Sequence, residues 1–191
     1  MTGQLSLLET PPALPEGMRY QAGFVSATEE RALVEAIAAL PFAPFQFRGF
    51  EGKRRTVSFG HHYDFNAGGL KPATPMPPFL LLLRERAARF AGLKAERLSH
   101  ALVIEYGEGA GIGWHRDRPV FCKVVGVSLR SPCTLRFRRR RGDKWQRLSL
   151  LAEPRSAYLL TGPARTEWEH SIPEVETLRY SVTFRSLQAQ L

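Results

Sequence analysis

The sequence predicts an α+β fold, with helices first and a β-barrel or β-sandwich in the C-terminal half. Two helical patterns lie within the first 92 residues, and short β-like segments separated by turns follow from residue 99 onward. Helices followed by a run of strands, without regular alternation of the two, favour this class. The chain has no internal repeats, so we expect one domain over residues 20–191. Prolines at 11, 12 and 15 predict a flexible tail over residues 1–19.

Each element has a local signal. Ser26 and Glu29 have capping-box spacing, which predicts a helix running from there to Leu40. Pro77 and Pro78 predict the start of a second helix, which ends at Ala91 with Gly92 as its stop. Residues 41–76 are expected to be irregular or in short strands. The remaining strands are expected at 100–106, 122–129, 133–139, 144–151, 156–160 and 178–186, with a hairpin turn at 141–144.

The composition is that of a globular protein, with 43% apolar and 24% charged residues. The longest apolar runs, such as Phe79–Leu83, fall far short of the roughly 20 residues of a membrane helix, so no membrane association is expected. The N-terminus lacks the pattern of a secretory signal. Cys122 and Cys133 lack CxxC spacing and are too few for a disulfide framework. We therefore expect a cytoplasmic protein, and we expect it to be a monomer.

The charge balance indicates a polyanionic partner. Lysine and arginine total 27 against 18 acidic residues, a net charge of +9. Such an excess favours nucleic acid through attraction to phosphates. The alternative is an arginine-rich, solvated surface with no such partner.

Three side chains are candidate metal ligands. His115 and Asp117 are two residues apart, so in an extended segment they point to the same side. His170 follows 53 residues after Asp117, which is far enough for the chain to return on a facing strand. Two histidines and one carboxylate form the triad of non-haem Fe(II) oxygenases. The alternative is that these are ordinary hydrogen-bonded histidines.

The segment Arg179–Arg185 has an unusual strand pattern. Arg179, Ser181 and Arg185 share one face with a threonine, while the other face is apolar. Arginine offers a planar fork that matches carboxylates, so this face suits a barrel that holds an anion. The alternative is an amphipathic edge strand whose polar face lies in water.

The order of these features (His-x-Asp, then His, then Arg-x5-Arg) resembles the AlkB-like branch of the Fe(II)/2-oxoglutarate dioxygenases. The resemblance runs from about Arg54 to Leu187. It includes Phe59-Gly60, Tyr63, Pro75-Met76-Pro77, Tyr106-Gly107-x-Gly109, Pro154-Arg155-Ser156 and Trp168-Glu169-His170.

The resemblance implies a double-stranded β-helix, a jelly-roll barrel with flanking N-terminal helices. It implies Fe(II) held by His115, Asp117 and His170, with 2-oxoglutarate and O₂ as co-substrates. Arg179 would bind the distal carboxylate of 2-oxoglutarate and Arg185 would lie near its chelating end. Tyr106 would hydrogen-bond the co-substrate and Ser181 would lie beside it. The implied activity is oxidative demethylation of N-alkylated DNA or RNA, as in DNA repair.

The sequence departs from the DNA-repair members of the family at several positions. Ile104 and Ser181 stand where those members usually carry asparagine, which puts 2-oxoglutarate binding in doubt. Arg118, with Pro119 and Val120, stands where acidic residues often contact the base. Two other functions therefore stay open. One is a dioxygenase acting on a protein side chain or small molecule, and the other is a nucleic-acid-binding module with a degenerate site.

Basic and aromatic residues supply candidate substrate contacts. Five arginines lie between residues 136 and 141, and Arg138, Arg139 and Arg140 are expected to track a phosphate backbone. Phe59 and Tyr63 are expected to offer stacking surfaces, with Arg118 nearby. The alternative is a solubilising hairpin tip with core aromatics.

The segment Gln4–Leu8 resembles the short peptide with which bacterial DNA-processing proteins bind the replication sliding clamp. Such peptides fold on binding. The alternative is a chance apolar patch.

Overall fold

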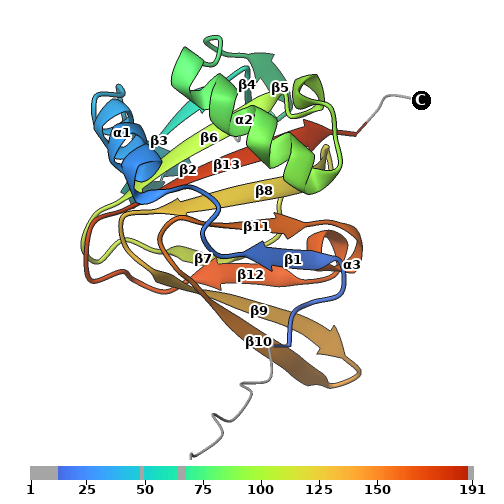
Figure 1. Cartoon of the computed structure of the whole chain (residues 1–191). Coiled ribbons are helices and arrows are strands. Elements are labelled where there is room, and N and C mark those ends of the chain that lie inside the picture. Colours follow the sequence, from blue (N-terminus) through green and yellow to red (C-terminus); the bar gives the residue numbers. More distant parts are fainter. Residues whose placement is uncertain (1–12, 48–49, 64–67, 189–191) are drawn as a thin grey trace, which may run out of the picture.

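The computed structural model describes residues 13–47, 50–63 and 68–188, and within them the chain forms two facing antiparallel sheets (Figure 1). The larger sheet has the order β1-β11-β8-β13-β6-β3-β2 and the smaller has the order β10-β9-β12-β7. A short ribbon of β4 and β5 stands apart. The segment Gln4–Leu8 lies outside the described residues.

The strands of the larger sheet are β1 (Met18–Gln21), β2 (Ala43–Phe47), β3 (Phe50–Phe59), β6 (His100–Tyr106), β8 (Phe121–Leu129), β11 (Ser156–Leu160) and β13 (Arg179–Leu187). Those of the smaller sheet are β7 (Ile112–His115), β9 (Cys133–Arg141), β10 (Lys144–Ala152) and β12 (Glu169–Ile172). The ribbon is made of β4 (His61–Tyr63) and β5 (Leu70–Pro72). The helices are α1 (Ala27–Ala38), α2 (Pro78–Ala91), η1 (Ala95–Arg97) and α3 (Gly162–Thr166).

The two predicted helices are confirmed, and the residues predicted to cap them are found at their ends. Ser26 caps α1 with both bonds of the capping box, because its hydroxyl accepts from the Glu29 amide and the Glu29 carboxylate accepts from the Ser26 amide. At the end of α2, Gly92 adopts the left-handed conformation, with φ of 64°, that glycine takes without strain. Both helices pack on the outer face of the larger sheet (Figure 1).

The larger sheet separates two hydrophobic cores. The first core lies between the helices and the larger sheet and includes Val103, Val127 and Val182. The second lies between the two sheets and includes Tyr106, Leu135 and Phe137. Alternate residues of β13 therefore face different cores, as the pattern of Arg179–Arg185 predicts. The polar face of this strand is turned towards the interior between the sheets.

Two expectations about the chain need correction. The predicted tail does not extend to residue 19, because Met18–Gln21 forms β1, which pairs with β11 and buries Met18. The segment 41–76 is more regular than expected, since β3 is ten residues long and pairs with both β2 and β6. No helix in the described part of the chain is both long and apolar enough to cross a membrane.

Candidate active site

The smaller sheet brings the two candidate histidines together. His170 on β12 is the register partner of His115 at the end of β7, and their ring centroids lie 4.2 Å apart. The Nδ1 of His115 is 2.9 Å from the carbonyl oxygen of Gly113. A proton on Nδ1 would donate to that carbonyl, which leaves the lone pair of Nε2 for a metal.

Asp117 lies against the same two rings. Its Oδ2 is 3.9 Å from the Nε2 of His170, and its Oδ1 accepts a hydrogen bond of 2.8 Å from the Nε of Arg185. The carboxyl of Asp117 is almost completely buried. Burial alone would raise its pKa, but the charge of Arg185, followed by those of the two histidines, holds the pKa well below its usual range. Asp117 is therefore an ionised carboxylate at neutral pH.

Both imidazoles are neutral at pH 7. Burial, followed by the charge of His115, lowers the pKa of His170 to about 3. Burial also lowers the pKa of His115, and Asp117 offsets part of this effect. Two neutral imidazoles and one carboxylate are the donor set that non-haem Fe(II) takes.

His115, Asp117 and His170 do not yet have the geometry of a metal site. Within the described residues, no three His, Cys, Asp or Glu side chains already form a group that could hold a metal ion. One oxygen of Asp117, Oδ1, is occupied by the hydrogen bond from Arg185. The chemistry of the donor set fits Fe(II), although the three side chains do not form a ready metal-binding group in this structure.

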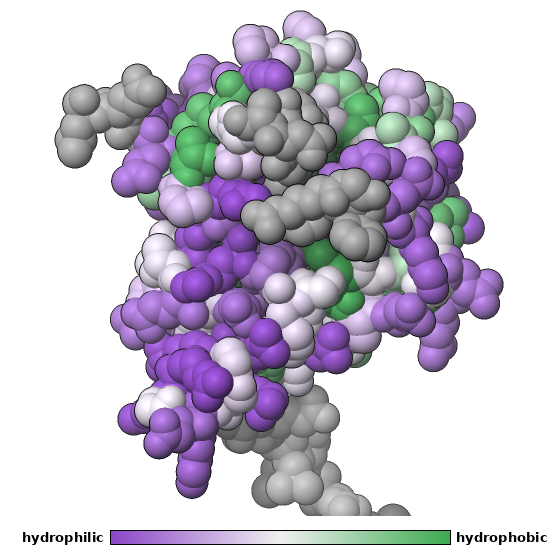
Figure 2. Space-filling view, turned by 180° about the vertical axis from the view of Figure 1, so that it is seen from behind, coloured by the Kyte–Doolittle hydropathy of each residue, from purple (hydrophilic) through white to green (hydrophobic). Residues whose placement is uncertain are grey.

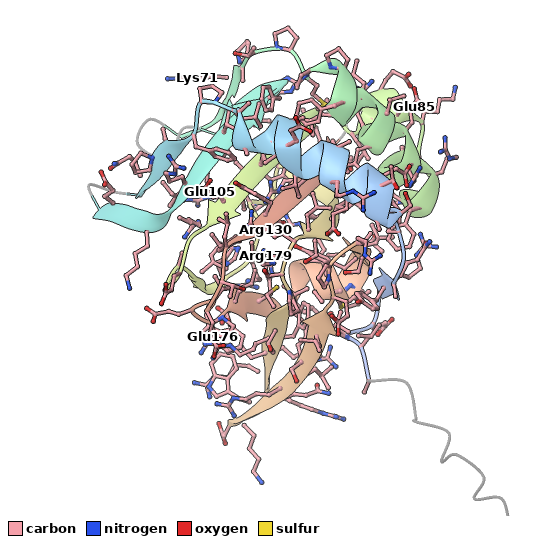
Figure 3. The ribbon with its side chains drawn as sticks, turned by 60° about the vertical axis from the view of Figure 1, so that its left-hand side comes forward. Lys71, Glu85, Glu105, Arg130, Glu176 and Arg179 are labelled. Carbon is pink, nitrogen blue, oxygen red and sulfur yellow. The ribbon has the colours of Figure 1, made fainter. Side chains whose placement is uncertain are left out.

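Arg179 is a buried cation with spare donors. Its side chain is completely buried, and Figure 3 places it near the middle of the molecule. Its Nη2 donates to the hydroxyl of Ser128 at 3.2 Å, while its Nε and Nη1 have no hydrogen-bond partner. Buried unpartnered donors are costly, and a cation in an interior calls for an anion. Arg179 thus fits a carboxylate of 2-oxoglutarate.

A pocket between the sheets joins these groups. His115, Asp117 and His170 line it together with Tyr106 and Arg185. Arg179 packs behind this wall, with its guanidinium carbon 5.0 Å from the centroid of the Tyr106 ring. Ser181 and Ile104, the two departures from the family pattern, line the same pocket, so both lie where a co-substrate would contact them.

Sequence reasoning missed Tyr158, which also lines the pocket. It is buried on β11, and burial raises the pKa of its hydroxyl. Its ring lies over Gly126 on β8, where an added Cβ would overlap the ring. Because Gly126 has no side chain, the Tyr158 ring can pack directly on the backbone of β8. The position of Tyr158 depends on Gly126 of another strand, so the sequence around Tyr158 alone does not indicate that it lines the pocket.

The candidate substrate residues separate into two groups. Tyr63 and Arg118 meet, because the Arg118 guanidinium carbon lies 5.1 Å from the Tyr63 ring centroid. Arg118 follows directly on Asp117, so this pair belongs near the metal ligands. The expectation for Phe59 is wrong, because this residue is buried in the core beneath the helices, where no base can stack on it.

The arginine run lies on β9 and alternates between two environments. Arg138 is bonded to Glu169 at 2.6 Å, and Arg140 lies 4.6 Å from the Trp145 ring centroid. Arg139 points the other way, bonds Glu167 at 2.8 Å and lies over the buried Trp168. Arg139 is therefore held in the fold, while Arg140 is exposed.

The chain matches a known family over residues 17–185, under the description 2OG-Fe(II) oxygenase superfamily. It belongs to that superfamily.

Similar proteins indicate which branch of the superfamily the chain resembles. The alkylated DNA repair protein ALKBH8 homolog of Arabidopsis thaliana is 27% identical over 208 aligned positions, covering 95% of this chain and 58% of the relative. The alpha-ketoglutarate-dependent dioxygenase alkB homolog 7, mitochondrial, of Mus musculus is 35% identical over 96 residues, covering 49% of this chain and 42% of the relative. The chain thus spans about half the length of these two relatives. Both indicate that it is AlkB-like.

The fold is confirmed by a solved structure, that of OsALKBH1. It superposes with a TM-score of 0.67 at 15% identity, covering 91% of this chain and 98% of that one. The expected double-stranded β-helix is therefore present, with its helices outside the larger sheet. Membership of this oxidoreductase family implies Fe(II), 2-oxoglutarate and O₂ as its cofactor and co-substrates.

Proposed function

We propose that this protein removes N-alkyl groups from nucleic acid by Fe(II)- and 2-oxoglutarate-dependent oxidation. The observation that carries the catalytic half is the pocket in which His115, Asp117 and His170 meet, with the spare donors of Arg179 beside it. The net charge of +9 supports the nucleic-acid half. The name of the Arabidopsis relative, which refers to alkylated DNA repair, supports it too.

Each residue of the site has a distinct task in this function. His115 and His170 would offer neutral imidazole nitrogens to Fe(II), and Asp117 would offer its carboxylate. Arg185 holds Asp117 ionised through its charge and its 2.8 Å hydrogen bond. Arg179 would receive the distal carboxylate of 2-oxoglutarate in the fork of its guanidinium. The loaded Fe(II) supplies the oxidation of a substrate C–H bond.

The walls of the pocket favour this reaction. Ile112, Val124 and Leu135 are apolar and line it, so they keep water from the reacting carbon. Hydroxylation of an N-methyl carbon gives a hemiaminal, whose C–N bond breaks to release formaldehyde and the unalkylated base. The pair of Tyr63 and Arg118 would provide a flat surface for that base.

The cofactor half is tested by anaerobic titration with Fe(II) and 2-oxoglutarate, followed by the visible metal-to-ligand charge-transfer band. We expect a band in the wild type and none in Asp117→Ala. Glu174→Ala, which removes an exposed carboxylate outside the pocket, is the matched control and keeps the band. If folded wild-type protein gave no band, we would conclude that Ile104 and Ser181 prevent 2-oxoglutarate from binding. A nucleic-acid-binding module would then be the better assignment.

The substrate half is tested by formaldehyde release. We expect release from N-methylated oligonucleotides and none from methylated peptides. The second candidate is the same oxidation of a protein side chain or an anionic small molecule. This second function is favoured by Arg118, a cation that directly follows Asp117 in the sequence. Release from peptides alone would assign the protein to that second function.

A further inference from the structure

One face of the four-stranded sheet gathers cations and indoles outside the catalytic pocket. His115, Leu135 and His170 of this sheet line the pocket, so their neighbours in each strand point outward. On β9 these are Arg136, Arg138 and Arg140. On the adjacent β10, the register pairs Arg138 with Arg147 and Arg140 with Trp145. We call the outward side of these strands, with Trp114 of β7, the outer face.

The outer face is organised around Arg138. Its guanidinium carbon lies 4.4 Å from the ring centroid of Trp114 and 4.4 Å from that of Trp145. Arg136 lies 5.2 Å from Trp114, and Arg140 lies 4.6 Å from Trp145. Cations and indole rings therefore alternate across three strands.

The charge of this face is strongly positive. Arg136, Arg138, Arg140 and Arg147 are opposed by Glu169, which bonds Arg138. Arg140 and Arg147 are exposed. The hairpin that carries them is at the lower right in Figure 1 and, seen from behind, forms a hydrophilic region at the lower left of Figure 2. Such a face attracts a polyanion.

We propose that the outer face binds single-stranded nucleic acid at a site separate from the catalytic pocket. The proposal rests on the nucleic-acid substrate proposed above and adds the surface that holds it. Arg140 and Arg147 would contact phosphates, and bases would pack against the exposed edges of Trp114 and Trp145, which are half-buried between the arginines. An acidic polypeptide would satisfy the arginines but has no flat rings to pack beside the stacked guanidinium groups and indoles. Nucleic acid therefore fits the face better.

The outer face lies on the opposite side of the smaller sheet from the pocket, which suits it to hold nucleic acid close to the catalytic site. Trp114 and the metal-ligand candidate His115 are consecutive residues of β7 that point to opposite sides of the strand. A strand of nucleic acid held by Trp114 thus lies on the far side of the wall of the pocket. It would raise the local concentration of bases at the pocket without touching the reacting groups.

The test compares two variants of equal net charge. Arg140→Glu/Arg147→Glu reverses charges on the outer face. Arg89→Glu/Arg97→Glu reverses two exposed arginines on α2 and η1, on the other side of the larger sheet. Binding of a fluorescein-labelled single-stranded oligonucleotide is measured by anisotropy at several salt concentrations. Retention of the Fe(II)–2-oxoglutarate band shows that each variant is folded.

We expect the outer-face variant to bind the oligonucleotide at least tenfold more weakly. The slope of log K against log[salt] should fall by roughly 0.7 for each phosphate that an arginine no longer neutralises, or about 1.4 for two. The helix-side variant should keep most of its affinity and its slope. Oligonucleotide binding should also quench tryptophan emission, and Trp145→Phe should remove part of that quenching.

Four results would each overturn a stated part of these proposals. Equal weakening in both variants would mean that only the overall charge matters. Polyglutamate of the same length binding as tightly as the oligonucleotide would assign the face to acidic polypeptides. A wild type that binds no oligonucleotide would remove the outer-face site as well as the nucleic-acid substrate. Intact binding without formaldehyde release would overturn the proposed demethylation alone.

Discussion

Replacing Arg179 by methionine should make the protein without ligands more stable while removing its response to 2-oxoglutarate. Arg179 is completely buried, and two of its donors have no partner. Each unsatisfied buried donor costs about 1–3 kcal/mol. The variant loses one hydrogen bond to Ser128, a charge-assisted bond worth about 1.5–3 kcal/mol. At the middle of these ranges the two unsatisfied donors outweigh the lost bond, which predicts a gain of about 2 kcal/mol in the free energy of unfolding of the apo protein.

The assay is urea unfolding of both proteins in three states: without ligands, with Fe(II) alone, and with Fe(II) and 2-oxoglutarate, with both Fe(II) states kept anaerobic. At a co-substrate concentration of about 100 times Kd, the wild type should gain about 2.7 kcal/mol, and Arg179→Met should gain nothing. Arg179→Lys is the control, because it keeps the charge but lacks the guanidinium fork, so it should not gain stability. An apo Arg179→Met protein less stable than the wild type, or one still stabilised by 2-oxoglutarate, would refute this reasoning.

Two further predictions concern parts of the fold around the site. Glu29→Gln should cost about 0.5–1 kcal/mol at pH 7, because Arg86 and the helix cap lower the pKa of this half-exposed carboxyl to about 2. The cost should disappear as the pH falls from about 4.5 to 2, because the folded wild type loses the charge of Glu29 over that range. Thermal unfolding of both proteins across this pH range measures the trend. Gly126→Ala should cost about 1–3 kcal/mol in urea unfolding, because the new Cβ displaces the Tyr158 ring. Tyr158→Leu should recover most of that cost in the double variant, and simple addition of the two costs would contradict the proposed overlap.

Local signals make much of the fold predictable. The capping box at Ser26, the proline entry and glycine exit of α2, and the alternating strand of Arg179–Arg185 all depend on neighbours within a few residues. The candidate triad comes from the sequence as a hypothesis, because His115 and Asp117 are close in sequence and the family order supplies His170. These signals need no knowledge of how the strands pair.

The remaining features depend on contacts between distant strands. The sequence predicts Phe59 as a stacking surface, whereas its burial follows from the pairing of β3 with β6, which turns one face of β3 to the helix core. Tyr158 cannot be found without Gly126 opposite it. The outer face needs Trp114, Arg138 and Trp145, which come from three strands. A run of arginines in the sequence does not reveal which of them share a side.

The hairpin of β9 and β10 also affects how copies of the protein meet one another. β10 is the terminal strand of the smaller sheet, and such an edge is a template for pairing with a second sheet. Lys144 and Arg147 place positive charge along it, and Leu151 adds an exposed apolar side chain further on. Two such edges repel each other when they approach. We therefore expect neutral substitutions at Lys144 and Arg147 to favour self-association through this edge.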